Sequence, residues 1–140
     1  MKSIRNQAGM TLIEIMIVLA IVGGLVAVLA GNVFSQFEKS KVNTVKIQFG
    51  ELTKSLQQYN LDCGSFPSTD EGLQALTSSS ASCTNWGPSP YASESLIKDP
   101  WNNEIIYEKN SSSSFTLFSM GADGMEGGEG IDADITSNNN

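Results

Sequence analysis

The chain has 140 residues, no histidine and a formal net charge of −7, and its length leaves room for one domain. The first nine residues hold two of the eight bases and no acid, so the remainder carries six bases against fifteen acids, a net charge of −9. This charge balance argues against nucleic acid as a partner, because phosphate binding needs an excess of bases. The absence of histidine removes the commonest general base and zinc ligand, and with them most hydrolase sites. A divalent cation matches the acidic excess better.

An apolar segment dominates the N-terminal part of the chain. Residues 15–31 contain no charged or strongly polar side chain, and back to Met10 the only interruptions are Thr11 and Glu14. About 20 apolar residues cross a bilayer core of roughly 30 Å. Both bases of the first nine residues precede the segment, and the positive-inside rule places that end in the cytoplasm. We therefore expect a single membrane span with the rest of the chain outside, where disulfides persist.

Three interpretations of this segment are open. A secretory signal peptide has an apolar core of roughly 7–15 residues and a small-residue cleavage site. This run is longer, and no Ala-x-Ala site follows before the polar Asn32. A plain membrane anchor fits the length but leaves Glu14 to snorkel to the interface, because a carboxylate at the bilayer centre costs roughly 2.5–3.5 kcal/mol. The third interpretation gives Glu14 a charged partner.

The residues around Glu14 favour the third interpretation. After a short basic leader, the run Gly9-Met10-Thr11-Leu12-Ile13-Glu14 resembles the processing site of type IV pilins and pseudopilins. The resemblance implies that a prepilin peptidase cleaves between Gly9 and Met10 and that the new amino group of Met10, where the family usually has phenylalanine, is methylated. It also implies an assembly role for Glu14. Its carboxylate and the α-ammonium of an adjacent subunit would neutralise each other in a low dielectric and set the axial stagger.

An amphipathic pattern continues the apolar segment as one helix. Apolar side chains recur at spacings of three and four on a single stripe formed by Val42, Val45, Phe49, Leu52, Leu56 and Tyr59. No proline lies between Met10 and Phe66, so we predict a helix from about Met10 to about Asn60, roughly 75 Å long. The stripe is interpreted as the core face. In the apolar half, helix contacts and ordinary membrane-helix composition explain the small residues equally well: Gly23, Gly24, Ala27, Ala30 and Gly31.

The remainder of the chain predicts a small head. Cys63 and Cys83 bracket about 20 residues, and a bridge between them would contribute roughly 3 kcal/mol, two buried free thiols being the alternative. We expect a short helix at 72–76 and a hairpin of two strands at 104–108 and 115–119. A hairpin is not stable alone. The expected fold class is therefore α+β, a long N-terminal helix packed on a small C-terminal antiparallel sheet, as in the type IV pilin-like fold.

Further motifs narrow the resemblance to the major pseudopilins of type II secretion systems. They are the runs Phe66-Pro67-Ser68-Thr69-Asp70-Glu71-Gly72-Leu73-Gln74-Ala75-Leu76, Lys98-Asp99-Pro100-Trp101-Asn102-Asn103, Ser119-Met120-Gly121-Ala122-Asp123-Gly124 and Ala133-Asp134-Ile135. Asn103 matches the asparagine of the family's Asp-Pro-Trp-Gly-Asn motif, whereas Asn102 stands where the family usually has glycine. Together with the processing site, the motifs cover nearly the whole chain in the expected order. The cysteine pair is not a general feature of that family.

The resemblance implies a structural subunit that performs no chemistry. Residues 1–9 would be a cleaved leader, 10–33 the transmembrane and polymerising half of the helix, and 34–140 a periplasmic head. The subunit would sit in the inner membrane with its N-terminus cytoplasmic, and would polymerise into a periplasmic filament that drives export of folded proteins across the outer membrane. Its implied partners are copies of itself, minor pseudopilins, the prepilin peptidase, the inner-membrane assembly platform and the outer-membrane secretin.

Two rival functions are consistent with parts of the sequence. A major pilin of a surface type IV filament, used for adhesion, motility or DNA uptake, shares the processing site. The acidic loop and the Asp-Pro-Trp motif favour the pseudopilin. A membrane-tethered calcium-binding or enzyme domain that acts alone is a rival of a different class, and it would give Glu14 no role in assembly.

The C-terminal loop is a candidate calcium site. Residues 121–135 hold five glycines, five acids and no base, so the segment repels itself without a counterion. Calcium takes six to eight oxygens from carboxylates and carbonyls, but the spacing is not that of an EF-hand. The resemblance implies one Ca²⁺ within the loop 119–135, with these ligands: Asp123, Asp132, Asp134 and the backbone carbonyl of Met120. Glu126 and Glu129 are interpreted as solvated. An acidic solubilising loop without metal is the alternative.

Overall fold

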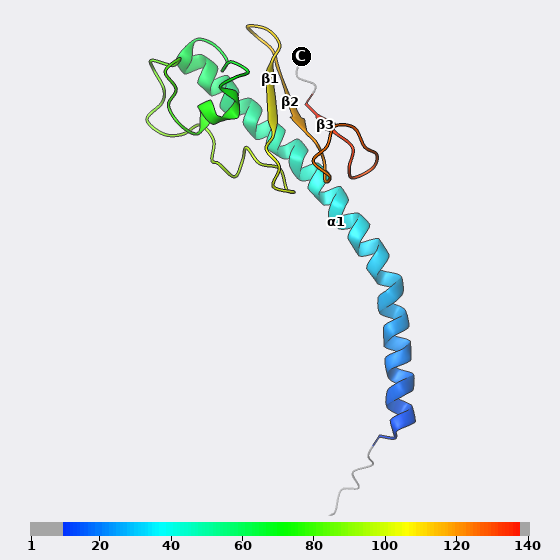
Figure 1. The fold of residues 1–140 in the computed structure, drawn as a ribbon. Helices are drawn as coiled ribbons and strands as arrows, with labels where there is room; N and C mark the ends of the chain where they lie inside the picture. Colours follow the sequence, from blue (N-terminus) through cyan, green and yellow to red (C-terminus); the bar gives the residue numbers. More distant parts are fainter. Residues whose placement is uncertain (1–9, 138–140) are drawn as a thin grey trace, which may run out of the picture. The chain divides into compact units, whose positions relative to one another are not determined.

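The computed structural model describes residues 10–137, apart from the side chains of residues 30–35. Its elements are the helix α1 (Leu12–Cys63), the 3-10 helix η1 (Gly72–Leu76) and the strands β1 (Ile106–Lys109), β2 (Phe115–Ser119) and β3 (Ile135–Thr136), as labelled in Figure 1. The chain divides into two compact units between Phe37 and Glu38. The predicted α+β class, a long helix with a small antiparallel sheet, is confirmed.

The helix α1 is 52 residues long. It begins after Thr11 and ends at Cys63, within three residues of the predicted bounds at both ends. The chain leaves the helix at Gly64, which has a φ of 79° and donates its amide to the Asn60 carbonyl at 2.9 Å. Glycine adopts this left-handed conformation readily because it has no Cβ, and it is the usual residue just beyond a helix C-terminus.

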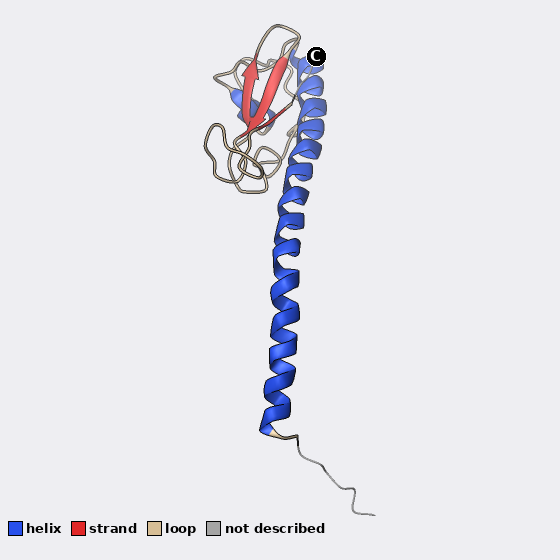
Figure 2. Ribbon diagram, turned by 90° about the vertical axis from the view of Figure 1, so that its right-hand side faces the viewer, coloured by secondary structure: helices blue, strands red, loops and turns tan. Residues whose placement is uncertain are grey.

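The second unit consists of two layers. Figure 2 shows the sheet and the loops on one side of the C-terminal part of α1. The predicted core stripe is confirmed, because five of its six members are buried and Val42 is partly buried: Val45, Phe49, Leu52, Leu56 and Tyr59. Tyr107 of β1 and Leu117 of β2 belong to the same core. The 3.6-residue period of the helix and the two-residue period of the strands thus meet in one apolar layer.

The sheet is antiparallel, with the order β1-β2-β3. β2 has the predicted bounds, but β1 begins at Ile106 and not at Glu104. The reason is a competing pairing: Glu104 forms an isolated bridge with Lys98, and the Ile105 amide donates to the Ile97 carbonyl at 2.9 Å. Residues 104 and 105 therefore pair with the preceding loop before the chain joins β2.

Strand β3 was not predicted from the sequence. It has only two residues, Ile135 and Thr136, which pair with Ser119 and Phe118. Beyond it, Ser137 donates its amide to the Leu117 carbonyl and accepts the Leu117 amide on its hydroxyl, both at 2.8 Å. These contacts fix the far end of the acidic loop to the sheet, so both ends of that loop are held by β2 or its partner. The helix η1 lies at the predicted 72–76.

Candidate functional site

The N-terminal part of α1 is a candidate membrane span. The window Leu12–Leu29 has a mean hydropathy of 2.8, and none of its side chains is buried. By length and composition this helix can cross a membrane. Met10 is described and exposed, whereas Gly9 lies outside the described residues, as does the predicted leader 1–9.

Glu14 takes part in a capping box at the start of α1. Its carboxylate oxygen Oε2 accepts the Thr11 amide at 3.0 Å and the Thr11 hydroxyl at 3.1 Å. In return, the Glu14 amide donates to the Thr11 hydroxyl at 3.3 Å. Reciprocal bonds of this kind satisfy amides that the first helical turn leaves unpaired. Thr11 is therefore a contact of Glu14 that the sequence analysis missed, although the spacing Thr-x-x-Glu before an apolar run is its known signal.

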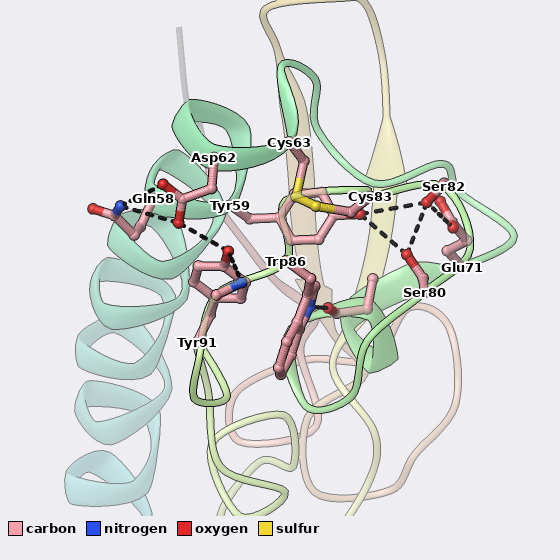
Figure 3. Close-up of a disulfide and its surroundings, with 12 residues drawn as sticks. Gln58, Tyr59, Asp62, Cys63, Glu71, Ser80, Ser82, Cys83, Trp86 and Tyr91 are labelled. Carbon is pink, nitrogen blue, oxygen red and sulfur yellow. Dashed lines mark hydrogen bonds between the residues drawn. A yellow bond between two sulfur atoms is a disulfide. The ribbon is translucent and has the colours of Figure 1, made fainter.

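Cys63 and Cys83 are joined by a disulfide in the structure, with their Cα atoms 5.0 Å apart. Cys63 is the last residue of α1, so the bond ties the serine-rich loop to the end of the helix (Figure 3). A hydroxyl network lies beside it: the Tyr59 hydroxyl contacts Ser80 and Ser82, and Ser82 donates to Glu71. The Ser82 hydroxyl and the Ser68 amide hold the pKa of Glu71 below its ordinary value.

The loop after Cys83 is held on α1 by aromatic side chains. The Tyr91 hydroxyl donates to Asp62 Oδ2 at 2.8 Å and accepts the Gly87 amide at 2.9 Å. Burial and the bond to Asp62 raise the pKa of Tyr91. Trp86 packs edge-on against Tyr91 and donates its indole N–H to the Ala75 carbonyl at 3.0 Å (Figure 3). The disulfide and these bonds together order a segment with few apolar residues of its own.

The Asp-Pro-Trp motif is hydrogen-bonded to the start of the acidic loop. Asp99 is buried, and its Oδ1 accepts the amides of Trp101 and Asn103 at 3.0 and 2.9 Å. Its Oδ2 accepts the Ser119 hydroxyl at 2.8 Å. Asn103 then donates its side-chain amide at 3.1 Å to the carbonyl of Gly121, a residue in the first turn of the acidic loop. The motif is a hydrogen-bonded brace between the 98–103 loop and the end of β2.

Asn102, which stands where the resembled motif has glycine, adopts a left-handed backbone conformation. Its φ is 71°, and it is the one non-glycine residue with positive φ among residues 10–137. Asparagine tolerates the left-handed region better than most residues with a Cβ. The departure from the family motif is therefore compatible with the turn that the motif forms.

The three predicted carboxylate ligands lie on the acidic loop but do not form a preassembled cluster. Asp123 is exposed, and its Oδ1 accepts the Met125 amide at 3.1 Å. Asp134 Oδ2 accepts the Gly127 amide at 2.8 Å. Across the described part of the chain, no group of three or more acidic or cysteine side chains is arranged to hold a metal ion. A cation here would have to draw the carboxylates together or rely on backbone carbonyls.

Two features of this loop fit a cation. Asp134 Oδ1 is buried and has no hydrogen-bond partner among the described residues, which is costly for a carboxylate oxygen. The backbone also folds closely on itself: a Cβ on Gly121, whose φ is 66°, would lie 2.9 Å from the carbonyl oxygen of Asp132. Calcium binds carboxylate and backbone carbonyl oxygens, and glycines allow a loop to turn those carbonyls toward the ion.

Two family models match the chain. The model described as type II secretion system protein G matches residues 32–138, and the prokaryotic N-terminal methylation motif matches residues 4–30. Together they span both the head and the apolar half of the helix. The second match covers the segment that contains Gly9, Met10 and Glu14.

Curated relatives carry the same description. A type II secretion system core protein G from Pseudomonas aeruginosa is 39% identical over 135 residues, with 94% of each chain covered. A protein of the same name from Vibrio cholerae is 37% identical over 140 residues, covering 96% of this chain and 94% of the relative. One from Xanthomonas campestris is 33% identical over 131 residues, covering 93% of this chain and 89% of the relative.

A solved structure agrees with these relatives. The crystal structure of the major pseudopilin from the type 2 secretion system of enterohaemorrhagic Escherichia coli superposes with a TM-score of 0.60 at 28% identity, covering 75% of this chain and 92% of that one. The resemblance to major pseudopilins is confirmed, and the alternative of a surface pilin is not favoured. The chain belongs to the type II secretion system protein G family.

Proposed function

We propose that this chain is the structural subunit of a type II secretion pseudopilus, a periplasmic filament that drives export of folded proteins across the outer membrane. The observation that carries the proposal is the apolar window Leu12–Leu29, which no part of the described chain covers, on the same helix that builds the core of a compact head. An apolar helix without a cover needs either lipid or other helices around it. The helix of a filament subunit is surrounded by lipid before assembly and by the helices of other subunits afterwards.

The proposal assigns a separate role to each part of the chain. Residues 1–9 are a leader that a prepilin peptidase removes between Gly9 and Met10, and Met10 is then N-methylated. Residues 10–33 cross the inner membrane before assembly, with the N-terminus cytoplasmic, and polymerise afterwards. Residues 34–140 form the periplasmic head. The match to the methylation motif supports the processing step, and the bases at the N-terminus support the orientation.

Glu14 is proposed to direct assembly. After cleavage, the α-ammonium of Met10 in an adjacent subunit would neutralise the Glu14 carboxylate within an apolar environment. The capping box bears on this step, because the carboxylate already accepts two bonds from Thr11 of its own chain. Those two bonds occupy one oxygen, Oε2, and leave Oε1 for the neighbour. Thr11 thus orients the carboxylate at the helix start.

Calcium is proposed to bind the acidic loop. Asp123, Asp132 and Asp134 would supply carboxylate oxygens, and Met120 a backbone carbonyl. The unpaired Oδ1 of Asp134 supports this ligand set. The Asp132 backbone lies close to Gly121, so the loop is folded tightly around the proposed site. The ion would neutralise like charges that otherwise repel one another within the loop. Its role is structural, since it stabilises the connection between β2 and β3.

The proposed partners follow from the same function. They are copies of this chain, minor pseudopilins, the prepilin peptidase, the inner-membrane assembly platform and the outer-membrane secretin. The disulfide supports an exported head, because such bonds persist in the periplasm and not in the cytoplasm. The subunit acts by assembly and performs no catalysis. Because the chain carries a formal net charge of −7, we propose no nucleic acid as a partner.

The test replaces the chromosomal gene with variants and follows both filaments and secretion. Glu14→Ala should insert in the membrane but fail to assemble, so that exported proteins accumulate in the periplasm. Glu14→Asp, which keeps the charge, is the matched control and should retain part of the assembly. Normal secretion with loss of twitching motility would instead support a surface pilus. Full assembly of Glu14→Ala would remove the proposed role of that residue.

A further inference from the structure

The solvent face of α1 in the second unit carries bases on a chain that is otherwise acidic. Ile47, Gly50 and Lys54 are spaced three and four residues apart on the side of the helix opposite the buried stripe. Lys39 and Lys46 flank them, and one acid, Glu51, lies beside Ile47 and Lys54 on the same side. All six residues are exposed. Ile47 to Lys54 spans seven residues, or roughly 10 Å along the helix axis. This set is called the basic face below.

The lysines of the basic face form no ion pair among the described residues of their own chain. The one ion pair among the described residues joins Lys41 to Glu38. No described carboxylate therefore lies within ion-pair distance of Lys39, Lys46 or Lys54. Ile47 keeps 64% of its surface exposed. A Cβ on Gly50 would meet nothing within 4 Å, so packing inside the subunit does not require glycine there. Glycine in a helix interior nevertheless costs about 1 kcal/mol relative to alanine.

The acidic loop offers the complementary surface. Met125 keeps 64% of its surface exposed, and Glu126 and Glu129 beside it are exposed too. Neither glutamate belongs to the proposed calcium ligands, and within residues 10–137 neither carboxylate accepts a hydrogen bond or forms an ion pair. Met125, with an exposed glutamate on either side, thus complements Ile47 on a face that holds three lysines and one acid, Glu51.

One copy cannot bring these two surfaces together. The loop joins β2 to β3, and the sheet packs on the buried stripe of α1, whereas Ile47 and Lys54 lie on the opposite side of the helix. We propose that the basic face of one subunit receives the Met125–Glu129 segment of the acidic loop of a second copy, an inference that rests on the proposed function. Because the two surfaces differ, the contact is heterologous. Repetition of such a contact extends an open filament unless its rotation happens to close a ring.

The proposed contact assigns different roles to the acidic residues of the loop. Asp123, Asp132 and Asp134 would bind the proposed ion, while Glu126 and Glu129 would contact the neighbour. Charge pairs at the rim of an interface set register and exclude wrong orientations more than they add affinity. Met125 against Ile47 would supply the apolar centre, and Gly50 would allow the loop backbone to approach the helix closely.

The first arm of the test reverses charges in the full-length chain and measures filaments sheared from cells that overproduce it. Lys46→Glu with Lys54→Glu should lower the yield by about tenfold, because glutamates would face glutamates. Adding Glu126→Lys and Glu129→Lys should restore the yield to within about twofold of wild type, because the attraction returns with its signs exchanged. Lys98→Glu with Glu94→Lys, which changes exposed charges elsewhere on the head, is the matched control and should leave the yield unchanged.

The second arm uses Gly50→Leu, which fills space that is open in the subunit and improves helix propensity. The head should remain folded, as judged by tryptophan fluorescence, while the filament yield falls by about tenfold because the loop can no longer approach. A third arm coexpresses Ile47→Cys in one copy with Met125→Cys in another and looks for an intermolecular disulfide in the filaments.

The outcomes separate this inference from the proposed function. Loss on charge reversal, recovery on the exchange and the intermolecular cross-link would support the contact. Wild-type filaments that tolerate the double reversal and Gly50→Leu, with no cross-link, would overturn the contact and leave the pseudopilus proposal standing. A wild-type chain that forms no filaments would contradict both.

Discussion

The two halves of α1 have similar apolar side chains but different surroundings. Leu19, in the apolar half, keeps 64% of its surface exposed, whereas Leu56, in the head half, is fully buried. Both belong to one continuous helix. The difference lies in what covers them: the head supplies a sheet and loops for Leu56, and the described chain supplies nothing for Leu19.

This comparison separates what folds the subunit from what assembles it. Burial of the head stripe stabilises the second unit, because each apolar side chain removed from water contributes roughly 1.5–3 kcal/mol. The apolar half contributes nothing of this kind until lipid or other helices surround it. Substitutions in the two halves should therefore affect different measurements. Trp86 and Trp101, the chain's two tryptophans, both lie in the head, so their fluorescence reports head unfolding alone.

The largest expected effect comes from Leu56→Ala. Removing a fully buried leucine leaves a cavity, so the free energy of unfolding of the head should fall by about 2–5 kcal/mol. Urea unfolding of the full chain in detergent, followed by tryptophan fluorescence, measures this. Leu19→Ala is the matched control and should leave the urea midpoint of the head unchanged. Equal losses in the two variants would break the comparison between the halves.

The disulfide should give the next effect. Cys63→Ser with Cys83→Ser should lower the free energy of unfolding by roughly 3 kcal/mol, because the loop between them gains freedom in the unfolded chain. The same urea experiment checks it, and wild type treated with reductant should reproduce the loss. Membrane insertion of the double variant should be normal, since the bond lies in the head. A variant that matches oxidised wild type would show that the bond contributes nothing to stability.

Calcium should stabilise the head but not the apolar half. At a concentration about 100 times its dissociation constant, calcium should raise the free energy of unfolding by about 2.7 kcal/mol. Asp134→Asn should remove the increase, because it removes the charge beside the unpaired oxygen. Glu129→Gln, on the same loop, is the control and should keep it. An identical melting temperature with calcium and with chelator would eliminate the proposed ion.

The smallest expected effect is alkaline and concerns Tyr107. Burial, with a smaller effect of nearby Tyr59, raises the pKa of Tyr107 to about 12, whereas the unfolded chain titrates near 10. The stabilisation is complete below pH 10 and is lost between pH 10 and 12, because the unfolded state releases its proton first. Tyr107→Phe should flatten this loss and leave a smaller slope from Tyr91. At neutral pH it should cost about 1 kcal/mol, through the bond from the hydroxyl to the Pro67 carbonyl.

Fluorescence-detected urea unfolding at several pH values would test the Tyr107 prediction. The free energies of unfolding of wild type and Tyr107→Phe should converge above pH 10 and cross before pH 12, because the alkaline loss of wild type exceeds its advantage at neutral pH. Parallel losses in the two proteins would assign the alkaline sensitivity to other groups. Since Tyr107 belongs to the sheet that covers the head half of α1, the result also measures how that cover depends on one buried hydroxyl.

Prediction from sequence succeeded where the signal was local and periodic. The stripe from Val42 to Tyr59 predicted both the helix and its buried face, because side chains three and four residues apart share a face. β1 begins two residues later than predicted, because Ile105 pairs with Ile97 in the preceding loop. A pattern of alternating apolar residues does not reveal that pairing. β3 was missed, because two residues carry no detectable period.

The candidate site shows the same division. The sequence by itself determined the apolar span, the processing motif around Glu14, the acidic loop and the cysteine pair, since these depend on composition and spacing. Only the tertiary structure decided that Asp99 braces Ser119, that Asn103 holds the Gly121 carbonyl and that the Asp134 oxygen is left without a partner. The structure also decided that the sheet packs on the side of α1 opposite Ile47 and Lys54. Those facts depend on contacts between residues distant in the sequence, which no local pattern specifies.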